Sequence, residues 1–438
     1  MRVSVTGCGY LGAVHAAAMA ALGHDVVGVD NDREKVDALV AGVAPVYEPG
    51  LSKLLRTGID SGRLRFSTDS RDVVGSTVHF VCVGTPQQED SYAADLTDLH
   101  ATFRALGGLV GDGDIIVGKS TVPVGTAARF AEELAEQAPG VTVVWNPEFL
   151  REGRAVEDSL HPDRLVYGVP EGAAGARATQ VLDDLYMPIL DAQTPRLVMN
   201  YPTAELVKVA ANSFLATKIS FINAMAELCE IAGGDITQLA DAIGMDERIG
   251  RKFLNAGLGF GGGCLPKDIR GFMARAAELH AQPAVSFLQG IDSINLRRRE
   301  RMVDLTVEAL GDRPLAGARV AILGLAFKPE SDDVRDSPAL DVAQKLDARY
   351  ADVVVTDPRA MENARRRAPN LKFALSPDEA VNGAEVVLLL TEWREYRELD
   401  PRSFGEGMRC RRIIDGRNSL DPASWRASGW DYRALGRH

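Results

Sequence analysis

The stretch Arg2–Gly12, RVSVTGCGYLG, decides the fold class. Its first half is rich in β-branched residues and predicts a short strand, and its second half fits the pattern G-x-G-x-x-G from Gly7 to Gly12. A second β-rich run, HDVVGVD at 24–30, ends in Asp30. A strand, a glycine turn that opens a helix, and a second strand ending in an acidic residue form a unit that binds dinucleotides. We therefore expect a parallel sheet with a dinucleotide site at its first turn.

The chemistry of this first unit favours NAD as its ligand. Glycine permits a tight turn and lets backbone N–H groups approach a pyrophosphate at the N-terminus of the following helix. A carboxylate at Asp30 would accept hydrogen bonds from ribose hydroxyls and would repel the 2′-phosphate of NADP. Arg33 and Lys35 follow closely, and there are two interpretations of each: a contact with the dinucleotide, or a place on a solvated helix face. We expect NAD rather than NADP.

Periodic apolar patterns continue this α/β architecture along the chain. Further strands are expected at 78–84, 115–118 and 141–145. From Thr203 to Ala232 apolar residues recur at helical spacing without Gly or Pro, which predicts one long helix. A second set of strands is expected at 319–323, 352–357 and 385–390, with a candidate fourth at 412–415.

The expected fold class is α/β, with two Rossmann-like doubly wound parallel-sheet domains joined by a long central helix and a helical middle domain. We expect the NAD-binding domain at 1–198, the central helical domain with its cysteine loop at 199–310, and the second Rossmann-like domain at 311–438. The second domain has GLAFK at 324–328 in place of the glycine fingerprint. It should therefore bind a different ligand, with Lys328 available for phosphate.

Composition and charge exclude several classes of function. The 438 residues include 49 basic and 61 acidic side chains, and the net charge of −12 argues against nucleic acid or an anionic membrane as partner. No apolar run is long enough to span a bilayer, and a strand pattern starts at the N-terminus. We expect no signal peptide, no membrane contact and a cytoplasmic location. The seven histidines show no ligand spacing, so no metal is expected.

The five cysteines are odd in number and far apart, and none forms a C-x-x-C pair. A disulfide framework and a cysteine-rich zinc site are both unexpected for such a pattern. Cys8, Cys82 and Cys229 have apolar or tightly packing neighbours, so we expect them in the core. Cys410 stands beside two arginines and receives no assignment.

Cys264 has a different setting, in the stretch FGGGCLPKD at 260–268. Pro266 suits the first turn of a helix, so Cys264 should lie just ahead of a helix N-terminus. The helix dipole and Lys267 would both favour the thiolate, and Gly261–Gly263 would leave the approach without side-chain bulk. From these residues alone, a packed cysteine in a capping turn and a reactive thiol are equally good interpretations.

Polar residues in apolar surroundings mark three more places. Lys208 and Asn212 are four apart on the long helix and share one face, as a functional pair or as a boundary stripe. KSTVP at 119–123 ends a strand at the expected ligand edge of the sheet.

The third place is WNPEFLRE at 145–152. There Asn146 can cap and Pro147 can start a helix, which would put Glu148 and Glu152 on one face. Solvated carboxylates are the alternative interpretation of these two side chains.

A series of motifs runs through the whole chain in a fixed order: GCGYLG (7–12), VGTP (83–86), STVPVGT (120–126), NPEFLREG (146–153), NSFLATKISFIN (212–223), RIGRKFLNAGLGFGGGCLPKD (248–268), GLAFKPESDDVRDSPAL (324–340) and IIDGRN (413–418). With these motifs the chain resembles the UDP-glucose/GDP-mannose dehydrogenases from end to end. FLATKISFIN and RIG-x-x-FLNAG resemble the UDP-glucose branch. Leu11 and Val209 are slight departures from residues frequent in the family.

The resemblance implies an NAD-dependent, four-electron oxidation of a nucleotide sugar, from UDP-glucose to UDP-glucuronate in that branch. An alcohol dehydrogenase without a nucleophile stops at the aldehyde. In this family a thiolate, here Cys264, adds to the aldehyde to give a thiohemiacetal, which loses a second hydride to become a thioester that water hydrolyses.

The resemblance also implies roles at matching positions. The catalytic residues would be Cys264, Lys208, Asn212, Asp268, Thr121 and Glu148, with the division of base duty among the last three left open. The dinucleotide would contact Gly7, Gly9, Tyr10, Leu11, Gly12, Asp30, Lys35, Thr85, Thr121, Glu152, Lys267 and Arg335. The UDP-sugar would contact Glu148, Phe149, Leu150, Arg151, Glu152, Lys208, Asn212, Arg248, Phe253, Leu254, Asn255, Ala256, Gly257, Gly261, Lys328 and Arg417. Arg248 would reach the substrate of a neighbouring subunit, which implies a homodimer.

Three alternatives differ from this interpretation. A dehydrogenase of GDP-mannose or of a UDP-N-acetylhexosamine would use the same chemistry. A two-electron hydroxyacid dehydrogenase would share the N-terminal fold and a lysine on a long helix, but would not require Cys264 or the C-terminal section. A non-catalytic NAD-sensing or redox-switch protein would use Cys264 as a sensor, and would leave Lys208 and Asn212 unexplained.

Overall fold

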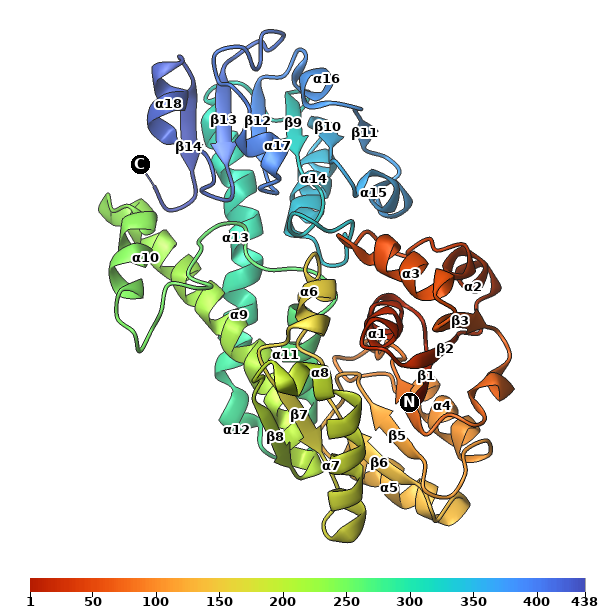
Figure 1. Ribbon diagram of the computed structural model, residues 1–438. Helices are drawn as coiled ribbons and strands as arrows, with labels where there is room; N and C mark the ends of the chain where they lie inside the picture. Colours follow the sequence, from red (N-terminus) through yellow and green to blue (C-terminus); the bar gives the residue numbers. More distant parts are fainter. Residues whose placement is uncertain (438) are drawn as a thin grey trace. The chain divides into compact units, whose positions relative to one another are not determined.

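The computed structural model describes residues 1–437 and divides into two compact units (Figure 1). Unit 1 comprises Met1–Ala211 and Arg270–His280, and unit 2 comprises Asn212–Ile269 and Ala281–His438. No helix among residues 1–437 is both long and apolar enough to cross a membrane.

Unit 1 is built on an eight-stranded sheet with the order β3-β2-β1-β4-β5-β6-β7-β8. All neighbouring strands pair in parallel except β6 and β7, which meet antiparallel through Trp145 and Gly168. The first six positions are those of a doubly wound dinucleotide-binding sheet, as predicted. The strands are β1 Arg2–Thr6, β2 Asp25–Val29, β3 Leu64–Ser67, β4 Val78–Val81, β5 Ile115–Gly118, β6 Thr142–Trp145, β7 Leu165–Gly168 and β8 Arg196–Met199.

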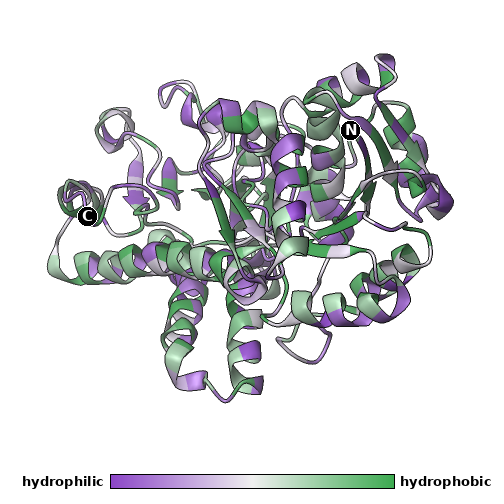
Figure 2. Ribbon diagram, turned by 60° about the horizontal axis from the view of Figure 1, so that its bottom comes forward, coloured by the Kyte–Doolittle hydropathy of each residue, from purple (hydrophilic) through white to green (hydrophobic). Residues whose placement is uncertain are grey.

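Helices cover both faces of this sheet. Adjacent residues of a strand point to opposite faces, so its apolar residues need a helical layer on each side. Val26 packs in one core with α1 and α7, whereas Val27 packs in the other with α4 and α5. In Figure 2 the surface helices mix hydrophobic and hydrophilic residues along their length. The helices are α1 Tyr10–Ala21, α2 Arg33–Val40, α3 Leu51–Asp60, the short η1 Ser70–Val73, α4 Thr97–Gly107, α5 Thr126–Gln137, α6 Ala155–Leu160, α7 Ala173–Leu185 and α8 Met187–Asp191.

The predicted long helix is α9, Tyr201–Ala232, and α11 spans Leu265–Glu278. The division between the two units falls within α9, after Ala211, and within α11, after Ile269. The long helix and the helix start after Cys264 are both as the sequence predicted.

Unit 2 contains a six-stranded parallel sheet with the order β11-β10-β9-β12-β13-β14. This order repeats that of the first six strands of unit 1 and confirms the predicted second Rossmann-like domain. Its strands are β9 Arg319–Leu323, β10 Asp352–Thr356, β11 Lys372–Phe373, β12 Val386–Leu389, β13 Arg412–Asp415 and β14 Asp431–Ala434. Its helices are α10 Ile236–Gly244, α12 Gln282–Val285, α13 Phe287–Leu310, α14 Pro338–Ala348, α15 Met361–Arg367, α16 Pro377–Val381, α17 Arg394–Arg397 and α18 Pro422–Ala427.

The second sheet differs from the first where a dinucleotide would bind. Asp357, which follows β10 as Asp30 follows β2, accepts hydrogen bonds from the backbone N–H groups of Leu325 and Ala326 at 2.7 and 3.0 Å, and from the Trp393 indole at 3.1 Å. Asp357 thus accepts from two backbone N–H groups of the turn after β9, whereas Asp30 accepts from one in the turn after β1. The next helix starts only at Pro338, so no helix N-terminus follows β9 directly. Both features agree with the missing glycine fingerprint.

Candidate active site

The turn after β1 has the geometry that a pyrophosphate needs. Gly7 has a φ of +88°, a conformation that L side chains rarely adopt. A Cβ on Gly12 would lie 1.8 Å from the carbonyl oxygen of Gly7, so only glycine fits there. A Cβ on Gly9 would meet nothing within 4 Å, which leaves the start of α1 open to a ligand.

Asp30 and Lys35, both predicted to contact the dinucleotide, lie together beside this turn. The buried Asp30 carboxylate accepts a hydrogen bond from the backbone N–H of Cys8 at 2.8 Å, and its two oxygens each lie 3.0 Å from Lys35 Nζ. Cys8 itself is in the core, as are Cys82 and Cys229, as predicted. A carboxylate held at the end of β2 fits the ribose of NAD.

The loops after β4 and β5 are tied to each other at the edge where ligands bind in such sheets. The Thr85 hydroxyl donates to the carbonyl oxygen of Thr121 at 2.8 Å, and the Ser120 hydroxyl donates to that of Val83 at 2.6 Å. The two threonines predicted for the site therefore belong to one connected loop pair.

The segment 146–151 is not helical, so the prediction of a helix starting at Pro147 is wrong. Asn146 does not cap a helix, because its side chain bonds to groups from three other parts of the chain. Glu148 instead accepts a bond from the backbone N–H of Leu150 at 2.5 Å. A helix, α6, begins only at Ala155, beyond both glutamates.

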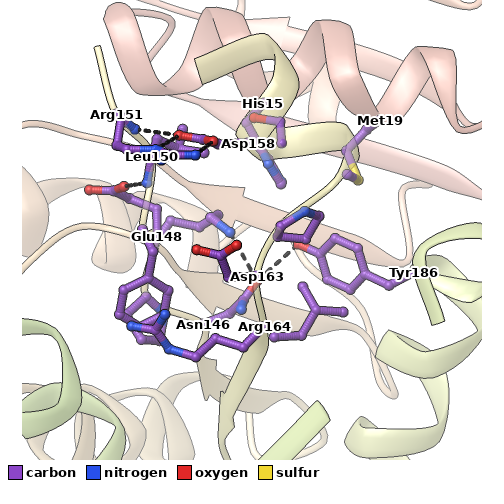
Figure 3. Close-up of a pocket in the computed structure, with 16 residues that line it drawn as sticks. His15, Met19, Asn146, Glu148, Leu150, Arg151, Asp158, Asp163, Arg164 and Tyr186 are labelled. Carbon is purple, nitrogen blue, oxygen red and sulfur yellow. Dashed lines mark hydrogen bonds and ion pairs between the residues drawn. The ribbon is translucent and has the colours of Figure 1, made fainter. Parts of the chain in front are cut away.

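Glu148 and Lys208 nevertheless form a close ion pair, with 2.9 Å between Oε1 and Nζ. Phe149 lies beneath the same lysine, whose Nζ is 5.6 Å from the ring centroid, and beside Arg164. Arg151 forms a two-pronged pair with the buried Asp158, and Figure 3 shows it turned toward that carboxylate and away from Glu148. Unit 1 thus brings together two predicted catalytic residues, Lys208 and Glu148, the latter being one of the three candidates for base duty.

Glu48 was not predicted, although it links two of the predicted segments. This buried carboxylate accepts a hydrogen bond from the Tyr10 hydroxyl at 2.6 Å and from the backbone N–H groups of Gly153 and Ala155 at 2.7 Å each. It therefore joins the start of α1 to the residue after Glu152. No sequence signal marks it, since a single glutamate in a loop has no periodicity and its partners are far along the chain.

In unit 2, Cys264 lies immediately before α11 and is exposed, as a reactive thiol requires. The Asp268 carboxylate is buried four residues later and accepts from Asn212 Nδ2 at 2.6 Å and from Lys267 Nζ at 2.8 Å. Four of the predicted residues are thus brought together at one helix start. Among the described residues no cluster of His, Cys, Asp and Glu could hold a metal ion.

The glycines before Cys264 have a structural role that the sequence did not indicate, because the chain packs closely against them. A Cβ on Gly261 would lie 2.3 Å from the Asp336 carbonyl oxygen, and one on Gly263 would lie 2.4 Å from the Arg335 guanidinium. The bare faces of these glycines are filled by the chain after β9. Arg335 pairs there with Asp333, at 2.7 Å.

The predicted UDP-sugar residues of unit 2 divide into two groups. Leu254 and Ala256 are buried in a core with α9 residues, so only their backbones can reach a ligand, and Phe253 adopts a φ of +66°. The Arg417 guanidinium donates to three backbone carbonyl oxygens, including those of Gly259 and Phe327. Gly257 is also buried, and its backbone N–H donates to Asn223 Oδ1 at 2.8 Å. Three predicted residues lie nearer the surface: Asn255, Lys328 over the Phe327 ring, and Arg248 paired with Asp246.

Comparison with known proteins gives matches along the chain. Residues 1–190, 202–297 and 321–422 match the NAD binding, central and UDP binding domains of the UDP-glucose/GDP-mannose dehydrogenase family. The UDP-glucose 6-dehydrogenase of Rhizobium meliloti is 41% identical over 440 residues, with both chains covered fully. A UDP-glucose dehydrogenase structure from Pyrobaculum islandicum has a TM-score of 0.90 at 39% identity, covering 100% of this chain and 98% of the other. A GDP-mannose dehydrogenase structure from Pseudomonas aeruginosa has a TM-score of 0.54 at 27% identity, covering 99% of this chain and 100% of the other.

Proposed function

Because the chain belongs to the UDP-glucose/GDP-mannose dehydrogenase family, we propose that it is an NAD-dependent dehydrogenase that oxidises UDP-glucose to UDP-glucuronate. The observation that carries this function is the exposed thiol of Cys264 at the start of α11, with the buried Asp268 carboxylate in the next turn. A nucleophile is what separates oxidation to an acid from oxidation to an aldehyde. Higher identity to UDP-glucose dehydrogenases than to the GDP-mannose enzyme favours UDP-glucose.

The proposed reaction has four steps at the C6 alcohol of the sugar. The alcohol loses a hydride and a proton and becomes an aldehyde, and the Cys264 thiolate adds to that aldehyde to give a thiohemiacetal. The thiohemiacetal loses a second hydride and a proton and becomes a thioester, and water hydrolyses the thioester to the carboxylate and the free thiol. NAD, when bound, supplies the acceptor for each of the two hydrides.

The contacts of each side chain suit the role proposed for it. Lys208 and Asn212 provide a cation and an amide donor for the oxyanions that form at C6. Glu148 and Asp268 are the two carboxylates available to accept protons, and each already lies within hydrogen-bond distance of a lysine. Thr121 would hold the water molecule at the loop pair formed with Thr85.

The dinucleotide and UDP-sugar contacts that the family resemblance implies, the domain boundaries and the location are part of the same proposal. The three matched segments support a division at residues 198 and 310 into NAD-binding, central and UDP-sugar-binding domains. None of the five cysteines forms a disulfide, and the proposed location is the cytoplasm.

We also propose a homodimer that uses the exposed apolar side of α9. Phe214, Phe221 and Leu228 recur every seven residues, and they are 66%, 47% and 56% exposed. Such a stripe is what a helix offers to a partner helix. Arg248, whose side chain is 89% exposed, would then be available to the substrate of the other subunit.

The dimer is tested by Phe221→Asp in analytical ultracentrifugation, with Leu375→Asp, at an apolar position that is 86% exposed and lies outside α9, as the control. We expect the control to stay dimeric and Phe221→Asp to sediment as a monomer. A Phe221→Asp dimer as tight as wild type would refute the use of this stripe.

The function is tested by counting NADH per sugar consumed, with UDP-glucose, GDP-mannose and UDP-N-acetylglucosamine as separate substrates. We expect two NADH per UDP-glucose and turnover of the other two sugars at least about 100-fold slower. One NADH per UDP-glucose would exclude the thioester route, and faster turnover of GDP-mannose would move the chain to the other branch.

A further inference from the structure

A small cavity lies behind the Glu148 segment, entirely within unit 1 (Figure 3). It has a volume of about 60 Å³, enough for a few water molecules and too small for a nucleotide sugar. Polar side chains line it, among them His15, Lys119, Asn146, Glu148 and Tyr186.

Lys119 is the unusual member of this lining. It follows β5, is 7% exposed, and its Nζ makes one hydrogen bond within the described residues, to Asn146 Oδ1 at 3.0 Å. Its Nζ also lies 5.9 Å from the centroid of the Phe80 ring. A buried ammonium whose hydrogen-bond partner is a neutral amide is costly to a fold, and an apolar side chain of similar size is often neutral or stabilising at such a site. The charge of Lys119 therefore needs a reason other than stability.

Asn146 is the group through which Lys119 can act. Its Oδ1 accepts from Lys119 and from the Tyr186 hydroxyl at 2.9 Å, and its Nδ2 donates to the carbonyl oxygen of Val166 at 2.9 Å. Asn146 is thus fixed by parts of the chain that follow β5 and α7 and by β7 itself. It is also the first residue of the irregular segment that carries Glu148 two positions later.

The positive charge of Lys119 also acts on the reacting groups directly. The pKa of Lys119 is lowered to about 8, first by burial, and it is influenced in opposite directions by the charges of Glu148 and Lys208. These three ionisable groups interact electrostatically, and only two of them have a role in the proposed reaction.

We propose that Lys119 is a positioning residue for the dehydrogenase reaction: its buried ammonium fixes the Asn146 side chain and keeps a positive charge behind the Glu148–Lys208 pair. The inference rests on the proposed function, because it assigns a purpose to Lys119 only if Glu148 and Lys208 act on a substrate. Loss of the ammonium loosens the segment that holds Glu148 and removes the positive charge behind the Glu148–Lys208 pair.

The other groups that face Lys119 constrain the pH dependence. Burial lowers the pKa of His15 on α1 well below its usual range, raises that of Cys82 after β4 to about 12, and raises that of Tyr186 after α7. The other ionisable groups that line the cavity are Glu148, Arg151, Asp158, Asp163 and Arg164, of which Arg151 pairs with Asp158 and Arg164 lies over the Phe149 ring. Lys119 is therefore the group in this cavity expected to lose its proton near pH 8.

The test uses Lys119→Met, which removes the charge, and Lys119→Gln, which keeps a hydrogen-bond donor for Asn146. The exposed Lys53→Met on α3 is the matched control. For each protein kcat and KM for UDP-glucose and for NAD are measured from pH 6.5 to pH 9.5, together with the urea midpoint of unfolding.

We expect Lys119→Met to lower kcat about 10- to 100-fold, with KM for NAD within twofold and an unfolding midpoint no lower than wild type. Lys119→Gln should recover part of the kcat that Lys119→Met loses. Above about pH 8, kcat should fall less steeply in the two Lys119 variants than in wild type and Lys53→Met. Wild-type kcat in Lys119→Met, or losses of kcat and of folded stability in parallel, would overturn the inference while leaving the proposed function in place. A wild-type protein that oxidises no nucleotide sugar would overturn both.

Discussion

The sharpest quantitative prediction concerns the stability of Lys119→Met as a function of pH. The lowering of the Lys119 pKa from its ordinary 10.5 to about 8 corresponds to about 3 kcal/mol of native-state destabilisation by the charged form. The residue is 7% exposed, so solvent screens little of this cost. Methionine has a similar length and no charge, and at pH 7 the variant should be more stable than wild type by up to about 3 kcal/mol.

The sign of the pH dependence follows from where the proton is lost. Below pH 8 both folded and unfolded wild type carry the proton, and the full cost applies. Between pH 8 and 10.5 the folded state has released the proton while the unfolded state keeps it, so wild-type stability rises with pH relative to the variant. The difference between the two proteins should therefore shrink from about 3 kcal/mol at pH 7 to about 1 kcal/mol at pH 9.5.

The assay is urea unfolding of protein labelled with 5-fluorotryptophan, with fluorine NMR as the readout of the folded and unfolded populations. Of the four tryptophans, Trp145 on β6 is the one that reports on unit 1. A stability difference that stays flat between pH 7 and pH 9.5 would show that Lys119 does not titrate near pH 8, and a variant less stable than wild type at pH 7 would show that the ammonium stabilises the fold.

Two further predictions concern the dinucleotide site. Glu48→Gln replaces an acceptor of three hydrogen bonds by an amide that can accept fewer, so NADH affinity, measured by fluorescence titration, should fall about 5- to 100-fold. The exposed control Glu34→Gln should leave NADH affinity unchanged. Unchanged affinity in Glu48→Gln would remove Glu48 from the site. Asp30→Asn removes the charge that repels a 2′-phosphate, so the preference for NAD over NADP in kcat/KM should fall about 10-fold or more relative to the exposed Asp37→Asn control. An unaltered preference would show that a group other than Asp30 determines the choice of cofactor.

The sequence predicted those parts of the fold that depend on local patterns. The strand–turn–helix at the N-terminus and the long helix α9 follow from periodicity, and periodicity along the chain is visible without a structure. The edge strand β8, Arg196–Met199, was not predicted, because its residues are exposed or half-buried and carry no core pattern. Strand β11 has only two residues, too few for any pattern.

Within the site, prediction failed where long-range contacts override local preference. Asn146 followed by proline is typical of a helix start, but Lys119 and Tyr186 occupy the oxygen that would cap the helix. The close packing of the backbone at Asp336 against Gly261, more than 70 residues earlier, was not predicted. No spacing in the sequence encodes either contact.

The central claim is that Cys264 carries the oxidation past the aldehyde, and it is tested by the products of Cys264→Ala beside wild type. Both proteins are incubated with UDP-glucose and NAD, quenched with acid during turnover, and examined for UDP-glucuronate and for a covalent group on the Cys264 peptide. Wild type should give UDP-glucuronate with two NADH per sugar and a UDP-glucuronyl thioester on that peptide, and Cys264→Ala should give no UDP-glucuronate. UDP-glucuronate formed by Cys264→Ala at the wild-type rate would contradict the proposed mechanism.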